Sequence, residues 1–214
     1  MSHQTTLPSL SLIENIEIRN DLSFLSCNYE SNPDLIERAR EFVQLQYSKL
    51  GYVGYDPEFD RQFDLNGYSR YFIAVNHSEE IVATSRVLTR GPFGLPIEYS
   101  LRNDTNEKTI LENGNIAEMN SFAASSMAAG SKVLSYSTDF LLEQGFSSTY
   151  GLYDIERPAM GKLYNRIGAV HSELHPYKIY FPSYGKVDHG SMTPTIWGIQ
   201  VSDVAKIIAK KSHK

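Results

Sequence analysis

One strand-like stretch carries a carboxylate where a buried apolar residue is usual. Ile116, Glu118, Asn120 and Phe122 alternate with Ala117, Met119, Ser121 and Ala123. This period of two is typical of a β-strand. A carboxylate in the middle of a strand that is at least half buried is uncommon, because burying an unpaired charge is costly. Glu118 is therefore our first candidate for a general base.

The residues that follow this strand are unusually small. The segment Ala123 to Gly130 contains only Ala, Ser, Met and Gly, and such residues let a backbone approach a ligand closely. We expect a helix to begin at about Ser131, where unpaired N–H groups and the positive end of the helix dipole would attract an anion. A base and a phosphate cradle on one element predict transfer of a group from a phosphate-bearing carrier. The alternative is structural: Glu118 pairs with an arginine of a neighbouring strand, and the turn is an ordinary loop.

Two further regions have residues suited to binding an acceptor. Arg86 lies in a predicted strand, where it either forms an ion pair with Glu118 or binds a carboxylate of a substrate. Residues 51–67 form a long connection with interleaved aromatic and acidic side chains, and connections of this length are often functional. As an acceptor-binding lid, its acidic residues, Asp60 among them, would receive an amine. The alternative is a surface loop that its rings hold in place.

The composition limits the classes of function. The chain has 214 residues, of which 21% are charged, and its net charge of −5 disfavours a nucleic-acid partner. The single cysteine, Cys27, excludes an internal disulfide, and we find neither a secretory signal nor a run long enough to span a membrane. We therefore expect a cytoplasmic protein with at most peripheral membrane contact. Its 14 Tyr and 10 Phe residues would allow a wide apolar cavity.

Hydrophobic periodicity predicts a single domain over residues 1–214. A helix capped by Asn32 runs from Pro33 to Leu50, and residues 70–76 and 80–90 form a hairpin. Further helices are predicted over residues 131–144, from Pro158 to Gly168 and after a cap at Ser202, with strands over residues 24–27, 116–122, 148–153, 170–174, 177–181 and 195–201. Residues 13–18 form a short strand or part of the arm. We expect a loose arm at residues 1–11, a polar surface excursion at 97–113, and a C-terminal helix with a basic tail at 202–214.

The histidines do not indicate a metal site. His171 and His175 are four residues apart, but they lie in a predicted strand and loop rather than on one helix face, and no third ligand suggests itself. We therefore expect no bound metal.

The order of these elements resembles that of the GNAT acyltransferase superfamily. In that family the turn after the fourth strand carries the motif Gln/Arg-x-x-Gly-x-Gly/Ala and holds the donor's pyrophosphate or phosphopantetheine. Residues Met127 to Lys132 are similar to this motif, with Met in place of Gln/Arg and Lys in place of the last Gly/Ala. Residues Met160 to Gly168 resemble a later motif, in which Tyr164 matches the tyrosine often proposed to protonate the leaving thiolate.

A narrower similarity, over most of residues 33–180, points to acyl-homoserine-lactone synthases and their relatives, the long-chain N-acyl amino acid synthases. The lactone synthases carry Glu-x-Ser-Arg-Phe on the central strand, whereas this chain has Glu118-Met119-Asn120-Ser121-Phe122, without the Arg. The pattern Gly-Pro-x-Gly-Leu-Pro at residues 91–96 also resembles the amino acid synthases. The similarity therefore favours the amino acid synthase branch.

This resemblance implies an α+β fold, with a central mixed, mostly antiparallel sheet flanked by helices, and an N-acyltransferase in which an amine attacks a thioester directly. Glu118 would take a proton from the amine, directly or through a water, and Tyr164 would protonate the leaving thiol. Arg86, Asn120 and Asp60 would bind the acceptor, an amino acid or a similar small molecule. The donor would be acyl-CoA or the acyl-phosphopantetheine of an acyl carrier protein, without a permanently bound cofactor. Its binding residues would be Phe122, Ala123, Ala124, Ser126, Gly130, Ser131 and Lys132.

The resemblance also implies how the donor is held. Backbone N–H groups of residues 122–124 would bind the thioester carbonyl and its oxyanion. Lys132, Lys162 and Arg166 would add positive charge toward an acidic carrier protein. Phe93, Tyr136 and Tyr150 would line a tunnel for the acyl chain, or else simply belong to the core.

Two alternatives stay open at this point. One is a short-chain N-acetyltransferase that uses acetyl-CoA, which an intact Gln/Arg-x-x-Gly-x-Gly loop would have favoured. The other is a non-catalytic GNAT-like module that binds acyl carriers without turnover, in which replacing Glu118 by Gln would change nothing.

Overall fold

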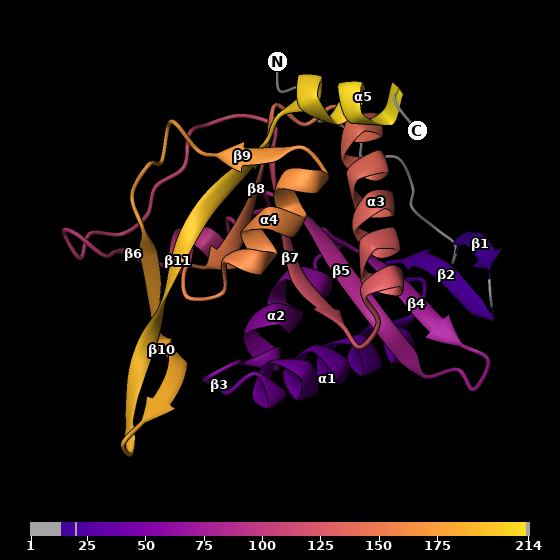
Figure 1. Cartoon of the computed structure of the whole chain (residues 1–214), viewed down its shortest axis with the longest axis horizontal. Helices are drawn as coiled ribbons and strands as arrows, with labels where there is room; N and C mark the ends of the chain where they lie inside the picture. Colours follow the sequence, from indigo (N-terminus) through magenta and orange to yellow (C-terminus); the bar gives the residue numbers. More distant parts are fainter. Residues whose placement is uncertain (1–13, 20, 213–214) are drawn as a thin grey trace.

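The computed structural model describes residues 14–19 and 21–212, which form one mixed β-sheet with helices on both faces (Figure 1). The strand order is β1-β2-β4-β5-β7-β8-β11-β10-β3, with β6 beside β10 and β9 beside β11. Neighbouring strands pair antiparallel except β7 and β8, which are parallel. The predicted α+β class and mostly antiparallel sheet are confirmed.

The strands are β1 (Glu14–Arg19), β2 (Leu22–Cys27), β3 (Tyr52–Val53), β4 (Ser69–Asn76), β5 (Ile81–Thr89), β6 (Leu101–Arg102), β7 (Ile116–Ala124), β8 (Ser148–Asp154), β9 (Ala169–His171), β10 (Ile179–Asp188) and β11 (Ser191–Ser202). The helices are α1 (Pro33–Lys49), α2 (Pro57–Asp64), α3 (Met127–Gln144), α4 (Pro158–Arg166) and α5 (Val204–Ser212), with a short 3-10 helix at Pro96–Tyr99. None of these described helices is both long and apolar enough to cross a membrane.

Helices α1 and α3 cover opposite faces of the same strands. Val133 of α3 belongs to one core cluster with Phe72 of β4. Ile36 of α1 packs in another with Tyr71 and Ile73 of β4. Because successive side chains of a strand point to opposite faces of a sheet, the two helices lie on opposite sides of β4.

The face that α1 covers also receives the candidate site residues. Phe63 of α2 packs there with Leu88 of β5 and Ile116 of β7. Arg86 precedes Leu88 by two residues and Glu118 follows Ile116 by two, so both side chains point to this face. The strand pattern therefore sets an arginine and a glutamate on adjacent strands, facing α1 and α2.

The sheet opens between β7 and β8. These strands pair only from Ile116 opposite Ser148 to Met119 opposite Gly151, after which β8 continues beside β11. On its other side β7 stays paired with β5, but the register shifts between Asn120 and Ala123, which marks a β-bulge. Ser121 lies in the bulge with a φ of 47°. The second half of β7 thus has one edge that faces an opening instead of a strand.

Two segments without predicted regular structure turn out to be structured. Residues 51–67 contain β3 and helix α2, which Asp56 caps by accepting the Glu58 N–H at 2.9 Å. Residues 97–113 were expected to run over the surface as a polar excursion. They contain β6, and Ile97 and Leu111 are buried in the core against α2. The surface expectation was wrong there because a few apolar residues anchor an otherwise polar stretch.

Three boundaries also differ from prediction. Helix α3 begins at Met127 instead of Ser131, with Ser126 as its cap, because Ala128 and Ala129 are strong helix formers. Asp203, not Ser202, caps α5, since its carboxylate accepts the Lys206 N–H at 3.0 Å. The strand predicted over 170–174 is the shorter β9. The strands predicted over 177–181 and 195–201 are the longer β10 and β11, which form a hairpin.

The other predicted helices and strands are confirmed, including α1 with its cap, the β4–β5 hairpin and the end of α3 at Gly145. The first residues of the chain, predicted to be a loose arm, lie outside the described part, while residues 14–19 are strand β1.

Candidate active site

A cavity of about 380 Å³ lies at the opening between β7 and β8. Its walls come from the end of α1, the β3–α2 region, β5, β7, α4 and the β10–β11 hairpin. The lining residues are Tyr47, Gly54, Tyr55, Asp56, Phe59, Asp60, Arg86, Pro96, Tyr99, Glu118, Met119, Asn120, Ser121, Phe122, Leu152, Tyr164, Phe181, Pro182, Ser183, Tyr184 and Trp197. The cavity thus brings together five residues that the sequence analysis singled out for chemistry or acceptor binding.

Two of the carboxylates that line this cavity are buried, Asp60 and Glu118, and of these Glu118 has no direct cationic partner among the described residues. It is 2% exposed, accepts the Ile97 N–H at 2.8 Å on one oxygen and the Asn120 side-chain amide at 3.0 Å on the other. Burial raises the pKa of Glu118 from its ordinary value to about 7, although both hydrogen bonds and the charge of Arg86 act to lower it. Near neutral pH the protonated and the ionised forms of Glu118 are therefore both populated.

Asn120 links Glu118 to Arg86. Its amide nitrogen donates to Glu118 and its amide oxygen accepts from Arg86 Nε at 2.8 Å. Arg86 and Asn120 are direct neighbours across β5 and β7. Arg86 was also considered as a direct ion-pair partner of Glu118. The described residues form no such pair, because the Asn120 side-chain amide lies between the two.

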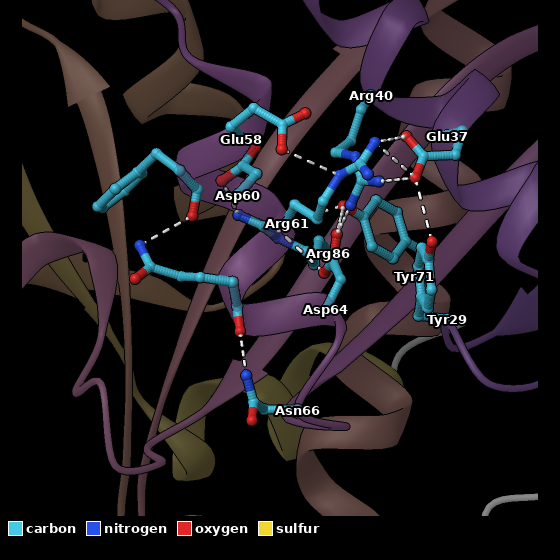
Figure 2. Close-up of polar contacts among 12 residues, drawn as sticks. Tyr29, Glu37, Arg40, Glu58, Asp60, Arg61, Asp64, Asn66, Tyr71 and Arg86 are labelled. Atoms are coloured by element: carbon cyan, nitrogen blue, oxygen red, sulfur yellow. Dashed lines mark hydrogen bonds and ion pairs between the residues drawn. The ribbon is translucent and has the colours of Figure 1, made fainter.

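Arg86 belongs to a buried group of charges, which we call the arginine cluster (Arg40, Asp60, Asp64, Tyr71 and Arg86; Figure 2). Arg86 Nη2 lies 2.5 Å from Asp60, and its Nη1 lies 3.4 Å from Asp64 and 3.3 Å from the Tyr71 hydroxyl. Arg40 of α1 lies 2.5 Å from the other oxygen of Asp64, which also accepts from Tyr71 at 3.0 Å. Nearby carboxylates hold the pKa of Arg86 well above its usual range, so it stays charged although buried.

Asp60, predicted to receive an amine, has a partner on each oxygen. One oxygen binds Arg86, and the other accepts the Tyr55 hydroxyl at 2.5 Å. The first turn of α2 thus places this carboxylate against β5. Asp60 lines the cavity, but its bonds within the protein hold it in place.

The second half of β7 runs along the opening: Ser121 and Phe122 line the cavity, whereas Ala123 and Ala124, also predicted to bind the donor, are not among its lining residues. The Ser125 N–H donates to Val82 O at 2.9 Å, so residues 123 and 125 hydrogen-bond toward β5. Because hydrogen bonding alternates along an antiparallel strand, the Ala124 N–H points the other way, into the opening beside β8. This geometry offers one backbone donor to a thioester or an amide, within the predicted segment Phe122 to Ala124.

Of the predicted phosphate-binding residues, Ser126 is the N-cap of α3, and Gly130, Ser131 and Lys132 lie in the helix itself. The Gly130 N–H bonds to Ser126 O inside the first turn, and a Cβ at Gly130 would be 2.9 Å from Ala124 Cβ, so glycine allows α3 to pack on β7. Ser131 is exposed, and Lys132 forms a 3.0 Å ion pair with Glu17 of β1. Ser126 Oγ accepts the Ala129 N–H at 3.4 Å, so the N–H groups of the helix start that this cap leaves open are those of residues 127 and 128, earlier than expected.

Tyr164 enters the cavity from α4. Its ring packs against that of Phe122, with centroids 6.4 Å apart, and burial raises the pKa of its hydroxyl. The hydroxyl is therefore protonated at neutral pH and makes no hydrogen bond to the residues that the structure describes. It can act as a proton donor inside the cavity.

The aromatic walls differ from those expected. Phe93 is exposed, Tyr136 packs between α3 and β2, and Tyr150 lies in the core beside His175, so these three do not line the cavity together. The rings in the walls are Tyr47, Tyr55, Phe59, Tyr99, Phe122, Tyr164, Phe181, Tyr184 and Trp197.

The wall beside β3 depends on a close backbone approach. Gly54 has a φ of 82°, and a Cβ on it would be 1.7 Å from the carbonyl oxygen of Ser183. Ser183 belongs to a four-residue bulge of β10, at residues 181–184, which turns out of the pairing with β11. The bulge contributes Phe181, Pro182, Ser183 and Tyr184 to the cavity wall.

The histidines do not form a metal site. His175 is hydrogen-bonded to Tyr177 at 3.0 Å and to Glu112 at 3.2 Å. Within residues 14–19 and 21–212, no group of three His, Cys, Asp or Glu side chains is arranged to hold a metal ion.

No protein-family model and no curated protein sequence matches the chain. Several solved structures, however, are similar to it in fold. FeeM, an N-acyl amino acid synthase from uncultured soil microbes, has a TM-score of 0.61 and 16% identity, covering 88% of this chain and 94% of FeeM. An acetyltransferase of the GNAT family from Staphylococcus aureus Mu50 has a TM-score of 0.53 and 15% identity, covering 84% of this chain and 98% of its own. The chain has the GNAT fold.

A third structure of this GNAT fold is spermidine N-acetyltransferase from Vibrio cholerae in complex with CoA and spermine. Its TM-score is 0.51 and its identity 11%, covering 89% of this chain and 99% of its own. At these identities the similarity extends to the fold, while the chemistry depends on the residues of this chain.

Within this GNAT fold, sequence reasoning missed Arg40, Asp64 and Tyr71. A signal for Arg40 was present, since it shares the buried face of α1 with Ile36 and Val43. Asp64 and Tyr71 carried no local signal, because their roles depend on α2 and β4 meeting in space.

Proposed function

We propose that this protein is an N-acyltransferase that moves an acyl group, expected to be long-chain, from an acyl-CoA or acyl-carrier-protein thioester to the amine of an amino acid or a similar small molecule. The observation that carries the proposal is Glu118, a buried carboxylate with a pKa of about 7 in the wall of a cavity within a GNAT fold. A general base works best when its pKa lies near the working pH.

In the proposed reaction the amine nitrogen forms a bond to the thioester carbon and the carbon–sulfur bond breaks. Glu118 takes the proton that the amine loses, directly or through a water. Such a base typically contributes about 100- to 10,000-fold in rate. The Ile97 N–H and the Asn120 amide fix the orientation of its carboxylate.

The thioester lies along the open edge of β7 in this proposal. The Ala124 N–H points into the opening and would donate to the carbonyl oxygen, where negative charge develops as the amine attacks. Phe122 and Ala123 shape the same edge. Tyr164, whose hydroxyl is protonated, would give its proton to the departing thiolate.

The donor's phosphate would lie at the start of α3. The N–H groups of residues 127 and 128, which the Ser126 cap leaves open, would provide donors at the positive end of the helix dipole. Ser131 lies within the next turn, and Gly130 permits the close contact of α3 with β7. Lys132 would add positive charge at the cost of its ion pair with Glu17.

A short-chain acetyltransferase is the second candidate, because two of the three structures described above are acetyltransferases. The departure of Met127 and Lys132 from the family motif and the size of the cavity favour the longer donor. A non-catalytic binding module would have the same fold without using Glu118.

The test is mass spectrometry of solvent extracts from cells that express the wild type or Glu118→Ala. We expect long-chain N-acylated small molecules with the wild type only, and their masses would identify both the acyl chain and the acceptor. If both extracts match empty-vector cells, acylation of purified amines with acetyl-CoA separates the second candidate from a binding module.

A further inference from the structure

We infer that the acceptor is a primary amine with an aromatic or apolar body and no carboxylate next to its nitrogen. The inference rests on the proposed acyl transfer and narrows its acceptor class to small amines other than free α-amino acids. It follows from the charges and rings that surround Glu118 in the cavity.

The first step concerns the positive charge available to a substrate carboxylate. Arg86 is the one cationic side chain among the described residues that line the cavity. Its donors already bind Asn120, Asp60, Asp64 and Tyr71, and it is 1% exposed. A substrate carboxylate would have to displace Asp60 and leave that acid buried without its cation, which is costly.

The second step concerns negative charge. Asp56, Asp60 and Glu118 all line the cavity, while the arginine cluster balances two arginines with two aspartates. A carboxylate placed beside the reacting nitrogen would add a further negative charge near Glu118, and like charges close together are unfavourable. An ammonium beside Glu118 has the opposite effect, because it stabilises the ionised form that acts as the base.

The oxygens of Glu118 also have room for such a group. Each accepts one hydrogen bond from the protein, whereas a carboxylate offers about four lone-pair sites. The amine can therefore donate to Glu118 without displacing Ile97 or Asn120.

The third step concerns the body of the acceptor. The rings of Tyr47, Tyr55, Phe59, Tyr99 and Trp197 line the cavity. Phe59 and Tyr99 meet edge to face, with centroids 5.0 Å apart. Such walls bind an apolar or aromatic body by burial and edge-to-face contact, and their faces attract a cation. They offer no charge to a carboxylate.

A matched set of three amines tests the inference with the purified full-length protein. The set is phenylalanine, phenylalanine methyl ester and 2-phenylethylamine, each with acetyl-CoA and with palmitoyl-CoA as donor. Products are identified by mass spectrometry, and kcat/KM is expressed per concentration of neutral amine. We expect the ester and 2-phenylethylamine to exceed the amino acid by on the order of 100-fold, the effect of an unpaired buried charge.

The outcomes separate the two proposals. A kcat/KM for phenylalanine equal to or above that of its methyl ester overturns the inference and leaves the acyl transfer in place. No acylation of any of the three with these two donors or with a palmitoyl-acyl carrier protein overturns the proposed function together with the inference.

Asp60→Asn tests the role of Arg86 in this preference. Asn keeps the shape and one acceptor for Arg86 but removes the competing negative charge, so the ratio of ester to amino acid should fall by about tenfold. Asp56→Asn is the matched control: it removes one negative charge at the cavity rim, retains a good helix cap, and has no bond to Arg86. The ratio is independent of how much protein is folded. An Asp60→Asn ratio equal to that of Asp56→Asn overturns the inference.

Discussion

Two buried polar regions meet at Asn120 and differ in their balance of charge. In the arginine cluster, Arg40 and Arg86 face two aspartates at 2.5 to 3.4 Å. Glu118 instead receives only neutral donors, the Ile97 N–H and the Asn120 amide. Both regions are almost fully buried, so exposure does not distinguish them.

The difference shows how one sheet provides both rigidity and reactivity. A buried carboxylate that has a cation stays ionised and holds its neighbours in place. In a buried carboxylate that has only neutral donors, no ion pair offsets the loss of hydration. Its pKa therefore rises toward 7, as for Glu118, and it can gain or lose a proton at neutral pH. Asn120 hydrogen-bonds to both Arg86 and Glu118, so it fixes the position of Glu118 relative to the arginine cluster although it carries no net charge itself.

The largest expected effect is the loss of kcat/KM when Glu118, the buried carboxylate without a cationic partner, is replaced. Glu118→Gln keeps the shape but cannot take a proton, so kcat/KM should fall by about 100- to 10,000-fold. Thiol release from acyl-CoA in the presence of the amine measures this, and an unchanged circular dichroism spectrum would show that the fold is intact. A loss below tenfold would contradict the role of Glu118 as base.

The next effect is on stability in the balanced region. Arg40→Met removes a buried cation that pairs with Asp64, so the free energy of unfolding should fall by about 3–5 kcal/mol. Urea denaturation measures the change. Arg38→Met on the same helix is the control: Arg38 is exposed, and its loss should cost less than about 1 kcal/mol. Equal losses for both variants would mean that the cluster is not a source of stability.

The pH dependence of activity tests the link between the regions. In the proposed mechanism the ionised Glu118 is the base, so kcat/KM should rise with pH and level off above about pH 7. The Asn120 hydrogen bond lowers the pKa of Glu118, so Asn120→Ala should move the inflection upward by up to about one unit. The residual activity of Glu118→Gln should lack this inflection. If the inflection persists there, it belongs to the amine and not to the enzyme.

The smallest expected effect is the pH dependence of stability. Folding raises the pKa of Glu118 from its ordinary value of 4.5 to about 7. Between pH 4.5 and about pH 7 the folded protein therefore keeps a proton on Glu118 that the unfolded chain has released. Its stability should therefore decrease as pH rises through this window, by about 1–3 kcal/mol relative to Glu118→Gln. Urea titrations of both proteins at pH 5 and pH 8 measure this difference, and parallel curves would contradict the raised pKa.

The sequence allowed prediction of a buried carboxylate at Glu118 and of most of the scaffold around it. Glu118 stood out because a mixed period of two placed it in the middle of a strand, and α1 because Asn32 and Pro33 mark its start. The same signature, Asp56 followed by Pro57, begins α2. It went unrecognised because the eight-residue helix is too short for a clear apolar periodicity.

The pairing of the site residues was not available from local patterns. Arg86 was expected to meet either Glu118 or a substrate, but three-dimensional packing gives it Asp60 and Asp64 from α2. The bulge at Ser121 and the opening between β7 and β8 likewise arise from strand pairing across the sheet. Such features depend on contacts between distant segments, which one sequence does not reveal.

The contact of Gly54 with Ser183 has a consequence for how the protein matures on the ribosome. Glu118, Arg86 and the aspartates of α2 are all synthesised before the bulge of β10, which supplies part of the cavity wall. A nascent chain that ends before residue 181 already contains Glu118 and its charged neighbours, yet it lacks the wall formed by residues 181–184 and Trp197. The cavity is therefore completed late in translation, after Glu118 and the arginine cluster have been made.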